Sequence, residues 1–301
     1  VFADGAGIYS DAIFTATSEP DLITSWIGGL AYSMRIYFDF SGYSDMAVGL
    51  ARLFGIVLPI NFFSPYQSGS IVEFWRRWHI TLSRFLKQYL YFSIGGNRVG
   101  RARQMVNIVI VMLLGGLWHG AAWTFVLWGG LHGIYIVLNQ MWRAFGKFKI
   151  PYLPGLIITN ICVIFAWVPF AASSSDVTFK IWKGMLGFNG VVLPEFLATT
   201  SLQKVFSFNN EPFRDIFLTG GGLSGASIFV GALLIAYLAP NLYTCFNIRN
   251  PVLDLKQFDY RLAYRFLRWR PSAIAASLLF LSFVSVIVHH VSSVEFLYFQ
   301  F

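Results

Sequence analysis

The sequence predicts an all-α polytopic membrane protein. Of its 301 residues, 56% are hydrophobic and only 12% are charged, whereas about a quarter of the residues in an ordinary soluble domain are charged. The mean hydropathy is +0.60, and a water-soluble core of this size has no room for so much apolar surface. These values exclude a soluble single-domain enzyme and predict one membrane-embedded domain over residues 1–301.

Long charge-free stretches locate the expected helices. Residues 153–172, 223–247 and 272–293 contain no Asp, Glu, Lys or Arg, and each can cross a hydrocarbon layer of about 30 Å, which takes about 20 helical residues. The charge-free stretch 104–142 would make a helix of about 58 Å, too long for one crossing. We expect it to form a hairpin of two short helices. Its glycines permit close helix contact and an unwound turn; they are Gly115, Gly116, Gly120, Gly129, Gly130 and Gly133.

The N-terminal part is less regular. Residues 23–38 and 43–63 resemble two spans, and two full crossings would return the chain to the wrong side before residue 72. One of them is therefore expected to be broken or re-entrant and packed inside the protein. The charged residues that interrupt these stretches are Arg35, Asp39, Asp45 and Arg52.

The basic residues predict the orientation in the membrane. Segments 72–103, 142–150 and 247–271 hold sixteen of the twenty-two Lys and Arg residues and only three acids, which is typical of cytoplasmic segments. The first 21 residues have acids only, and the connector 173–222 is balanced in charge. Both are expected outside the cytoplasm, so the net charge of +8 reflects polarity across a membrane and not a nucleic-acid partner.

His119, in the run Leu114-Gly115-Gly116-Leu117-Trp118-His119-Gly120, is one candidate for catalysis. It lies about 22 Å along the first arm of the hairpin, beside the turn. It is either a neutral histidine that stabilises the helix break or a general base on a buried path. His132 lies near mid-membrane and is interpreted as structural or, at most, as a polar group that supports a neighbouring site residue.

Residues 73–89 form a second candidate. Aromatic residues and leucines recur there at three- and four-residue spacing, while Arg76 and Arg77 lie on other faces, which predicts a basic amphipathic helix in the cytoplasmic interface. Its arginines either anchor lipid headgroups or meet an anionic donor such as a phosphopantetheine phosphate, with His79 facing the interior.

Polar residues at 39–45 form a third candidate. Asp39 follows Arg35 by four residues, so a salt bridge within one helix explains it simply. Alternatively, Asp39, Ser41 and Asp45 line a polar path for a hydroxyl substrate. No cofactor or metal site is predicted, because phosphate-binding and metal-ligating motifs are absent and Cys162 and Cys245 have no ligand spacing.

In their order and spacing over residues 32–145, these motifs resemble the membrane-bound O-acyltransferases, in particular the bacterial branch with the alginate O-acetyltransferase membrane subunit and the D-alanyl-teichoic-acid transferase. The matching runs begin at Asp39, Phe74, Tyr89, Gly95 and Gly115. The ending 296–301 also resembles the alginate branch, whereas the connector 173–222 has no counterpart that we recognise. The resemblance implies further spans before Val1.

The resemblance implies a multi-pass protein of the bacterial inner membrane, with short, broken and re-entrant helices around a central tunnel. His119 would be the catalytic histidine and His79 the second histidine of the family. Trp118 and Asn97 also belong to the matched motifs. The implied reaction moves an acetyl group from acetyl-CoA or an acyl carrier protein on the cytoplasmic side, through an extracytoplasmic acetyltransferase partner, to a polysaccharide such as alginate.

In such a reaction, backbone N–H groups of the glycine-rich turn or the Trp118 indole N–H would donate hydrogen bonds that stabilise the oxyanion. A different class of protein stays open. A proton- or ion-coupled transporter would use His79, His119 and the two aspartates as a relay, although we find no inverted repeat. A third interpretation is a scaffold subunit that only recruits polysaccharide enzymes.

Overall fold

The computed structural model describes residues 1–146, 148–193, 207–209 and 222–246, with scattered positions between 272 and 284. Nearly all of its regular structure is helical. Two two-residue strands, β1 (Val192–Leu193) and β2 (Ser207–Phe208), pair in parallel. The predicted all-α class is thus confirmed. Segment 247–271, the ending 296–301 and much of the 173–222 connector and the 272–293 stretch lie outside the described residues.

The N-terminal part differs from its prediction. After α1 (Phe2–Phe14), α2 runs from Leu22 to Leu53 as one helix of 32 residues, about 48 Å long. The expectation of two segments, one of them broken, is wrong because α2 is continuous through residues 39–45. Two of the interrupting charges have partners outside the helix: Arg35 pairs with Asp11 on α1, and the Tyr243 hydroxyl donates to Asp45.

The start of α2 is set by an N-cap. Asp21 begins the helix, since its side chain accepts the backbone N–H groups of Ile23 and Thr24 as an N-cap. The chain then reaches the one-turn helix η1 (Pro65–Gln67).

The predicted helix over 73–89 is divided into three short pieces: α3 (Ile71–Arg77), α4 (Ile80–Phe85) and the π-helix η2 (Leu86–Tyr91). The break falls at His79, whose φ of 40° is left-handed. Of its aromatic residues, Phe74, Trp75 and Trp78 are buried in the main core, whereas Phe85 and Tyr89 are exposed. The prediction of one continuous amphipathic helix is therefore wrong, while that of short, broken helices holds here, and the place of the segment in the cytoplasmic interface stays a prediction.

The predicted hairpin is confirmed. Helices α5 (Arg101–His119) and α6 (Trp123–Phe145) pack along each other and are joined by residues 120–122. A Cβ at Gly116 would overlap the carbonyl oxygen of Phe125, and one at Gly129 would overlap that of Met112. Glycine is thus required where the two backbones meet.

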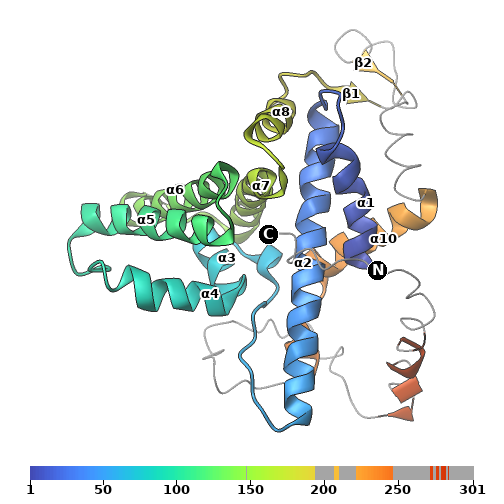
Figure 1. The fold of residues 1–301 in the computed structure, drawn as a ribbon, viewed down its shortest axis with the longest axis horizontal. Helices are drawn as coiled ribbons and strands as arrows, with labels where there is room; N and C mark the ends of the chain where they lie inside the picture. The colour runs from blue at the N-terminus through green and yellow to red at the C-terminus, as the bar shows by residue number, and fades with distance from the viewer. Residues whose placement is uncertain are drawn as a thin grey trace.

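The remaining helices are α7 (Tyr152–Ala171), α8 (Ser175–Met185), α10 (Gly222–Leu238) and α11 (Leu242–Cys245). In Figure 1, α1 lies alongside α2, while the α5–α6 hairpin runs across the direction of α2. Helix α7 contacts both α2 and α6, so it connects the α1–α2 pair to the α5–α6 hairpin. The main core at this junction is rich in large aromatic residues, among them Trp78, Trp128 and Trp167.

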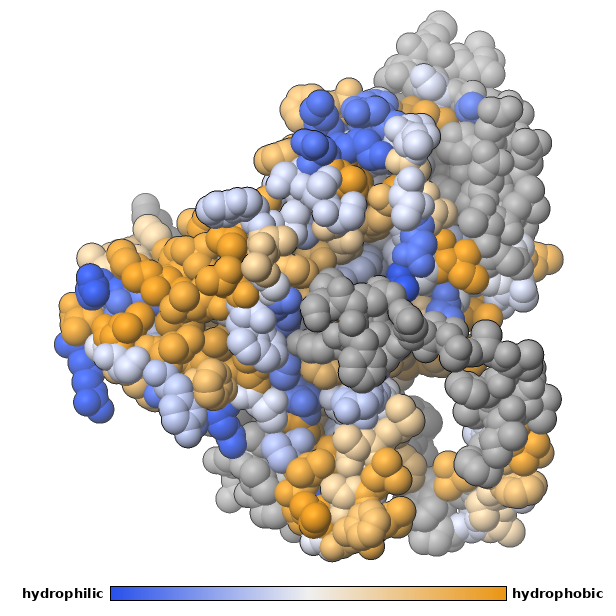
Figure 2. Space-filling model, in the orientation of Figure 1, coloured by the Kyte–Doolittle hydropathy of each residue, from blue (hydrophilic) through white to orange (hydrophobic). Residues whose placement is uncertain are grey.

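Two of the described helices, α5 and α7, are long and apolar enough to cross a membrane by composition alone; α10 is apolar but shorter, with 17 residues. Figure 2 shows apolar side chains over much of the α5–α6 hairpin. Exposed large apolar residues there include Val106, Ile110, Leu114, Leu117, Trp123, Ile134, Leu138 and Met141. A surface of this kind suits contact with lipid.

Candidate active site

His119 is the last residue of α5, immediately before the turn to α6. Its half-buried imidazole meets the rings of Trp128 and Phe170 edge-on, at centroid distances of 5.1 and 5.0 Å. The ring of its neighbour Trp118 lies 4.9 Å away. The helix end, together with the unwound turn, places the imidazole between α6 and α7.

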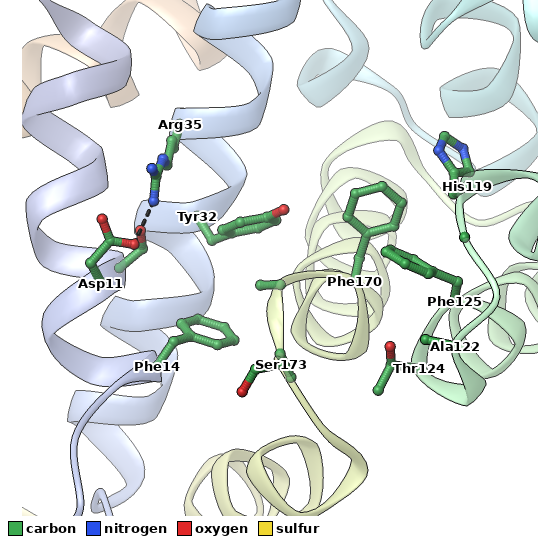
Figure 3. A pocket seen from close by; sticks show the side chains of 14 residues that line it. Asp11, Phe14, Tyr32, Arg35, His119, Ala122, Thr124, Phe125, Phe170 and Ser173 are labelled. Atoms are coloured by element: carbon green, nitrogen blue, oxygen red, sulfur yellow. Dashed lines mark hydrogen bonds and ion pairs between the residues drawn. The ribbon is translucent and has the colours of Figure 1, made fainter. Parts of the chain in front are cut away.

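One side of His119 faces a pocket of about 510 Å³, which we call the outer pocket because α1 and the segment after α7 are predicted outside the cytoplasm. Figure 3 shows Arg35 joined to Asp11 at one end and His119 at the other, with Phe125 and Phe170 beside the histidine. The lining consists of Ser10, Asp11, Phe14, Tyr32, Arg35, His119, Gly120, Ala122, Thr124, Phe125, Phe170, Ala171, Ala172 and Ser173.

The other side of His119 faces a narrow gap of about 10 Å³. His79 lies across it, so the structure brings together two histidines that are forty residues apart in the sequence. We call this space the histidine gap. It is lined by Ile36, Phe40, Trp78, His79, His119, Trp128, Trp167 and Phe170.

The backbone break orients His79. Its Nδ1 accepts the backbone N–H of Leu82 at 3.4 Å, which caps α4. A neutral imidazole has one acceptor and one donor nitrogen, so this bond places the hydrogen on Nε2. His79 lies outside the helices that we treat as spanning. Burial, and secondarily the charge of nearby His119, lower the pKa of His79, so its imidazole is neutral at pH 7.

The polar residues at 39–45 lie around the site and not in it. Phe40 is the residue of this run that lines the histidine gap. Asp39, Ser41 and Asp45 line neither the gap nor the outer pocket, and Asp45 accepts a hydrogen bond of 2.6 Å from Tyr243. The polar path proposed for these three positions is therefore not part of the two cavities that border His119, and it stays a prediction.

The two predicted donor-binding arginines have different environments. The Arg77 side chain turns inward, where it bonds Glu73 at 2.6 Å and the Phe63 carbonyl at 3.3 Å. Arg76 is exposed and lines a cleft of about 330 Å³ together with Lys87, Gln140 and the apolar residues Trp75, Leu86 and Met112. We call it the basic cleft. It shares no lining residue with the histidine gap.

Two other predicted residues lie away from the gap. Asn97 is exposed in the turn that precedes α5, so the full length of that helix, about 28 Å, separates it from His119. Trp118 packs its ring edge on His119 but is 59% exposed and lines neither the outer pocket nor the gap.

His132 has the structural role that the sequence analysis assigned to it. It is fully buried, and its Nδ1 accepts the Trp75 indole N–H at 3.2 Å. Sequence reasoning missed three contributors to the site: Trp128, Phe170 and the Arg35–Asp11 pair. Across the described residues, no three His, Cys, Asp or Glu side chains are grouped so as to hold a metal ion.

Comparison with known proteins agrees with the motifs. The sequence model of the membrane-bound O-acyltransferase family matches residues 15–178, which hold both histidines. The chain is 47% identical over 197 residues to the peptidoglycan O-acetyltransferase of Helicobacter pylori, covering 64% of this chain and 37% of that protein.

It is 42% identical over 257 residues to the probable alginate O-acetylase AlgI of Pseudomonas aeruginosa, covering 84% and 44%. It is 36% identical over 118 residues to the teichoic acid D-alanyltransferase of Streptococcus thermophilus, covering 37% and 28%. The chain thus spans less than half the length of these relatives. Its match to the family model covers more than half of its own residues, and the chain belongs to the membrane-bound O-acyltransferase family.

Proposed function

We propose that this chain carries the acyl-transfer centre of an O-acyltransferase that O-acetylates an extracytoplasmic polysaccharide such as alginate. The observation that carries this proposal is the position of His119, where the outer pocket meets the histidine gap. The relatives are named as O-acetyltransferases of alginate and peptidoglycan and as D-alanyltransferases. All these names describe transfer of an acyl group to a cell-surface polymer.

The chemistry requires few groups. A thioester is already activated, so its acyl group can pass to an alcohol without a covalent enzyme intermediate. The reaction needs a base that takes the hydroxyl proton and donors that hold the developing oxyanion. His119 is the base in this proposal, because its apolar ring neighbours favour the neutral imidazole and the outer pocket gives a hydroxyl access to it.

The two faces of the protein suggest the routes of the substrates. The acceptor would approach through the outer pocket, whose polar groups include Arg35, Asp11 and Thr124. The donor, acetyl-CoA or an acylated carrier protein, would come from the side of the basic segments, where Arg76 and Lys87 line the basic cleft. In this proposal the protein is a multi-pass protein of the bacterial inner membrane, and an extracytoplasmic acetyltransferase partner completes the transfer to the polymer.

Replacement of the proposed base tests this function. His119→Ala should abolish polysaccharide O-acetylation in cells and acetyl-CoA-dependent thiol release in membrane vesicles, with expression unchanged. Trp123→Ala is the matched control, because Trp123 is close in sequence but 81% exposed and outside the pocket lining. Acetyl transfer by His119→Ala protein at the wild-type rate would refute the assignment. Ion flux in proteoliposomes without thioester consumption would indicate a transporter.

A further inference from the structure

The indole of Trp128 has an unsatisfied hydrogen-bond donor. Trp128 lies on α6 and is 2% exposed, and its Nε1–H reaches no acceptor among the residues that the structure describes. A buried N–H without an acceptor is destabilising, and native proteins satisfy nearly all such groups. We therefore expect this N–H to donate to an oxygen atom of a bound molecule.

The neighbours of Trp128 leave one place for its acceptor. Its ring contacts those of His119, His132 and Trp75. A neutral histidine has a single acceptor nitrogen, and that of His132 already receives the Trp75 indole N–H. His132 thus cannot satisfy Trp128. The remaining polar environment is the histidine gap, which Trp128 lines together with His79 and His119.

The size of the gap fits one oxygen atom. Its volume of about 10 Å³ is close to the smallest space that holds a single water oxygen. Apart from the two imidazoles and the three indoles of Trp78, Trp128 and Trp167, its lining side chains are hydrocarbon. A carbonyl oxygen in this space would meet donor groups in a dry environment, where hydrogen bonds to a developing charge are strongest.

We propose that the Trp128 indole N–H binds the thioester carbonyl oxygen and stabilises the oxyanion during transfer, with the His79 Nε2–H as a second donor. The acceptor oxygen bonds to the carbonyl carbon while His119 takes its proton, and the electron pair of the C=O bond moves to the oxygen held by Trp128. When the C=O bond re-forms, the C–S bond breaks and the thiolate takes the proton from His119. Trp118, considered above for this role, is largely exposed. The assignment rests on the proposed function.

An isosteric replacement tests the donor itself. Benzothienylalanine replaces the indole N–H by sulfur and keeps the bicyclic ring, and Trp128→Phe removes the N–H along with part of the ring. Removing one oxyanion donor lowers kcat by about 10²–10³-fold. We expect a loss of this size in kcat for thiol release from acetyl-CoA and from acetylated carrier protein by membrane vesicles, with KM changed by less than about threefold.

The matched control is the same replacement at Trp182, whose indole N–H donates to the Phe165 carbonyl outside the site; its kcat should stay within about twofold of wild type. A Trp128→benzothienylalanine variant with kcat within threefold of wild type would overturn the proposal, as would a rise in KM that accounts for the whole loss. If the Trp128 variant keeps the wild-type rate while His119→Ala is inactive, the proposed role of Trp128 is refuted and the proposed function is not. If His119→Ala keeps its rate, the proposed function fails. A melting temperature equal to that of wild type excludes misfolding as the cause.

Discussion

Gly116→Ala should disturb both the α5–α6 contact and His119, the proposed base, which ends α5. The added Cβ would overlap the backbone carbonyl oxygen of Phe125, which cannot rotate away as a flexible side chain does. The two helices must part by about 1 Å to restore an ordinary contact distance. Overpacking of this kind costs about 1–3 kcal/mol, and the higher helix propensity of alanine returns at most about 1 kcal/mol of it.

Gly49→Ala provides the matched control, because it adds the same methyl group to helix α2 where nothing lies within 4 Å. It should stabilise the protein by about 0.5–1 kcal/mol. The detergent-solubilised variants can be melted with a thiol-reactive fluorogenic dye, since Cys162 and Cys245 are free. At about 2–4 °C per kcal/mol, Gly116→Ala should melt several degrees below Gly49→Ala.

Activity gives a second measure. His119 lies three residues after Gly116, within one helical turn, so the separation of the helices moves the imidazole. A misplacement of about 1 Å at a reacting group can cost 10²-fold in rate. If Gly116→Ala melts at or above Gly49→Ala and transfers acetyl groups at the wild-type rate, the close backbone contact does not position the base.

Substitutions at three further contacts, each measured by thermal melting, test the contacts of His79, Tyr243 and Arg77. His79→Ala should destabilise the protein by about 0.5–2 kcal/mol because α4 loses its cap, and His79→Asn should restore much of it, since Asn tolerates the left-handed backbone and can accept the Leu82 N–H; equal melting of the two would contradict this. Tyr243→Phe should cost about 1–3 kcal/mol because Asp45 loses a buried partner, and an unchanged melting temperature would show that water replaces the hydroxyl. Arg77→Ala should cost about 1–3 kcal/mol through its ion pair and carbonyl bond, whereas Arg76→Ala should change stability by less than about 0.5 kcal/mol.

The sequence predicted those elements that depend on local pattern. The α5–α6 hairpin and α7 follow from the length of charge-free stretches, because a helix rises about 1.5 Å per residue and a membrane has a fixed thickness. The close contact at Gly116 and Gly129 follows from residue size. The place of His119 beside the turn follows from both. None of these inferences needs knowledge of a distant partner.

Elements that depend on distant partners were not predictable in this way. Arg35 looked like half of a local pair with Asp39, but its partner Asp11 comes from another helix. Asp45 is satisfied by Tyr243, almost two hundred residues away. With Arg35 and Asp45 paired in this way, these two charges do not require a break in α2. A sequence pattern shows that a charge lies in an apolar stretch but not what neutralises it, so the helix was wrongly divided.

The site itself depends on two irregular points in the backbone. His79 lies in a left-handed break between α3 and α4, and His119 lies at the end of α5 before an unwound turn. Within regular helices, both imidazoles would project into a helix–helix contact and be packed there, as His132 is. At helix ends they face the histidine gap. The Nδ1 of His79 accepts the Leu82 N–H, and this hydrogen bond stabilises the break. A left-handed histidine costs about 1–2 kcal/mol, a strain of the kind that clusters at functional sites. The backbone break and the histidine gap are thus one feature, and a substitution that restores a regular helix at residue 79 would relieve the strain and close the proposed site.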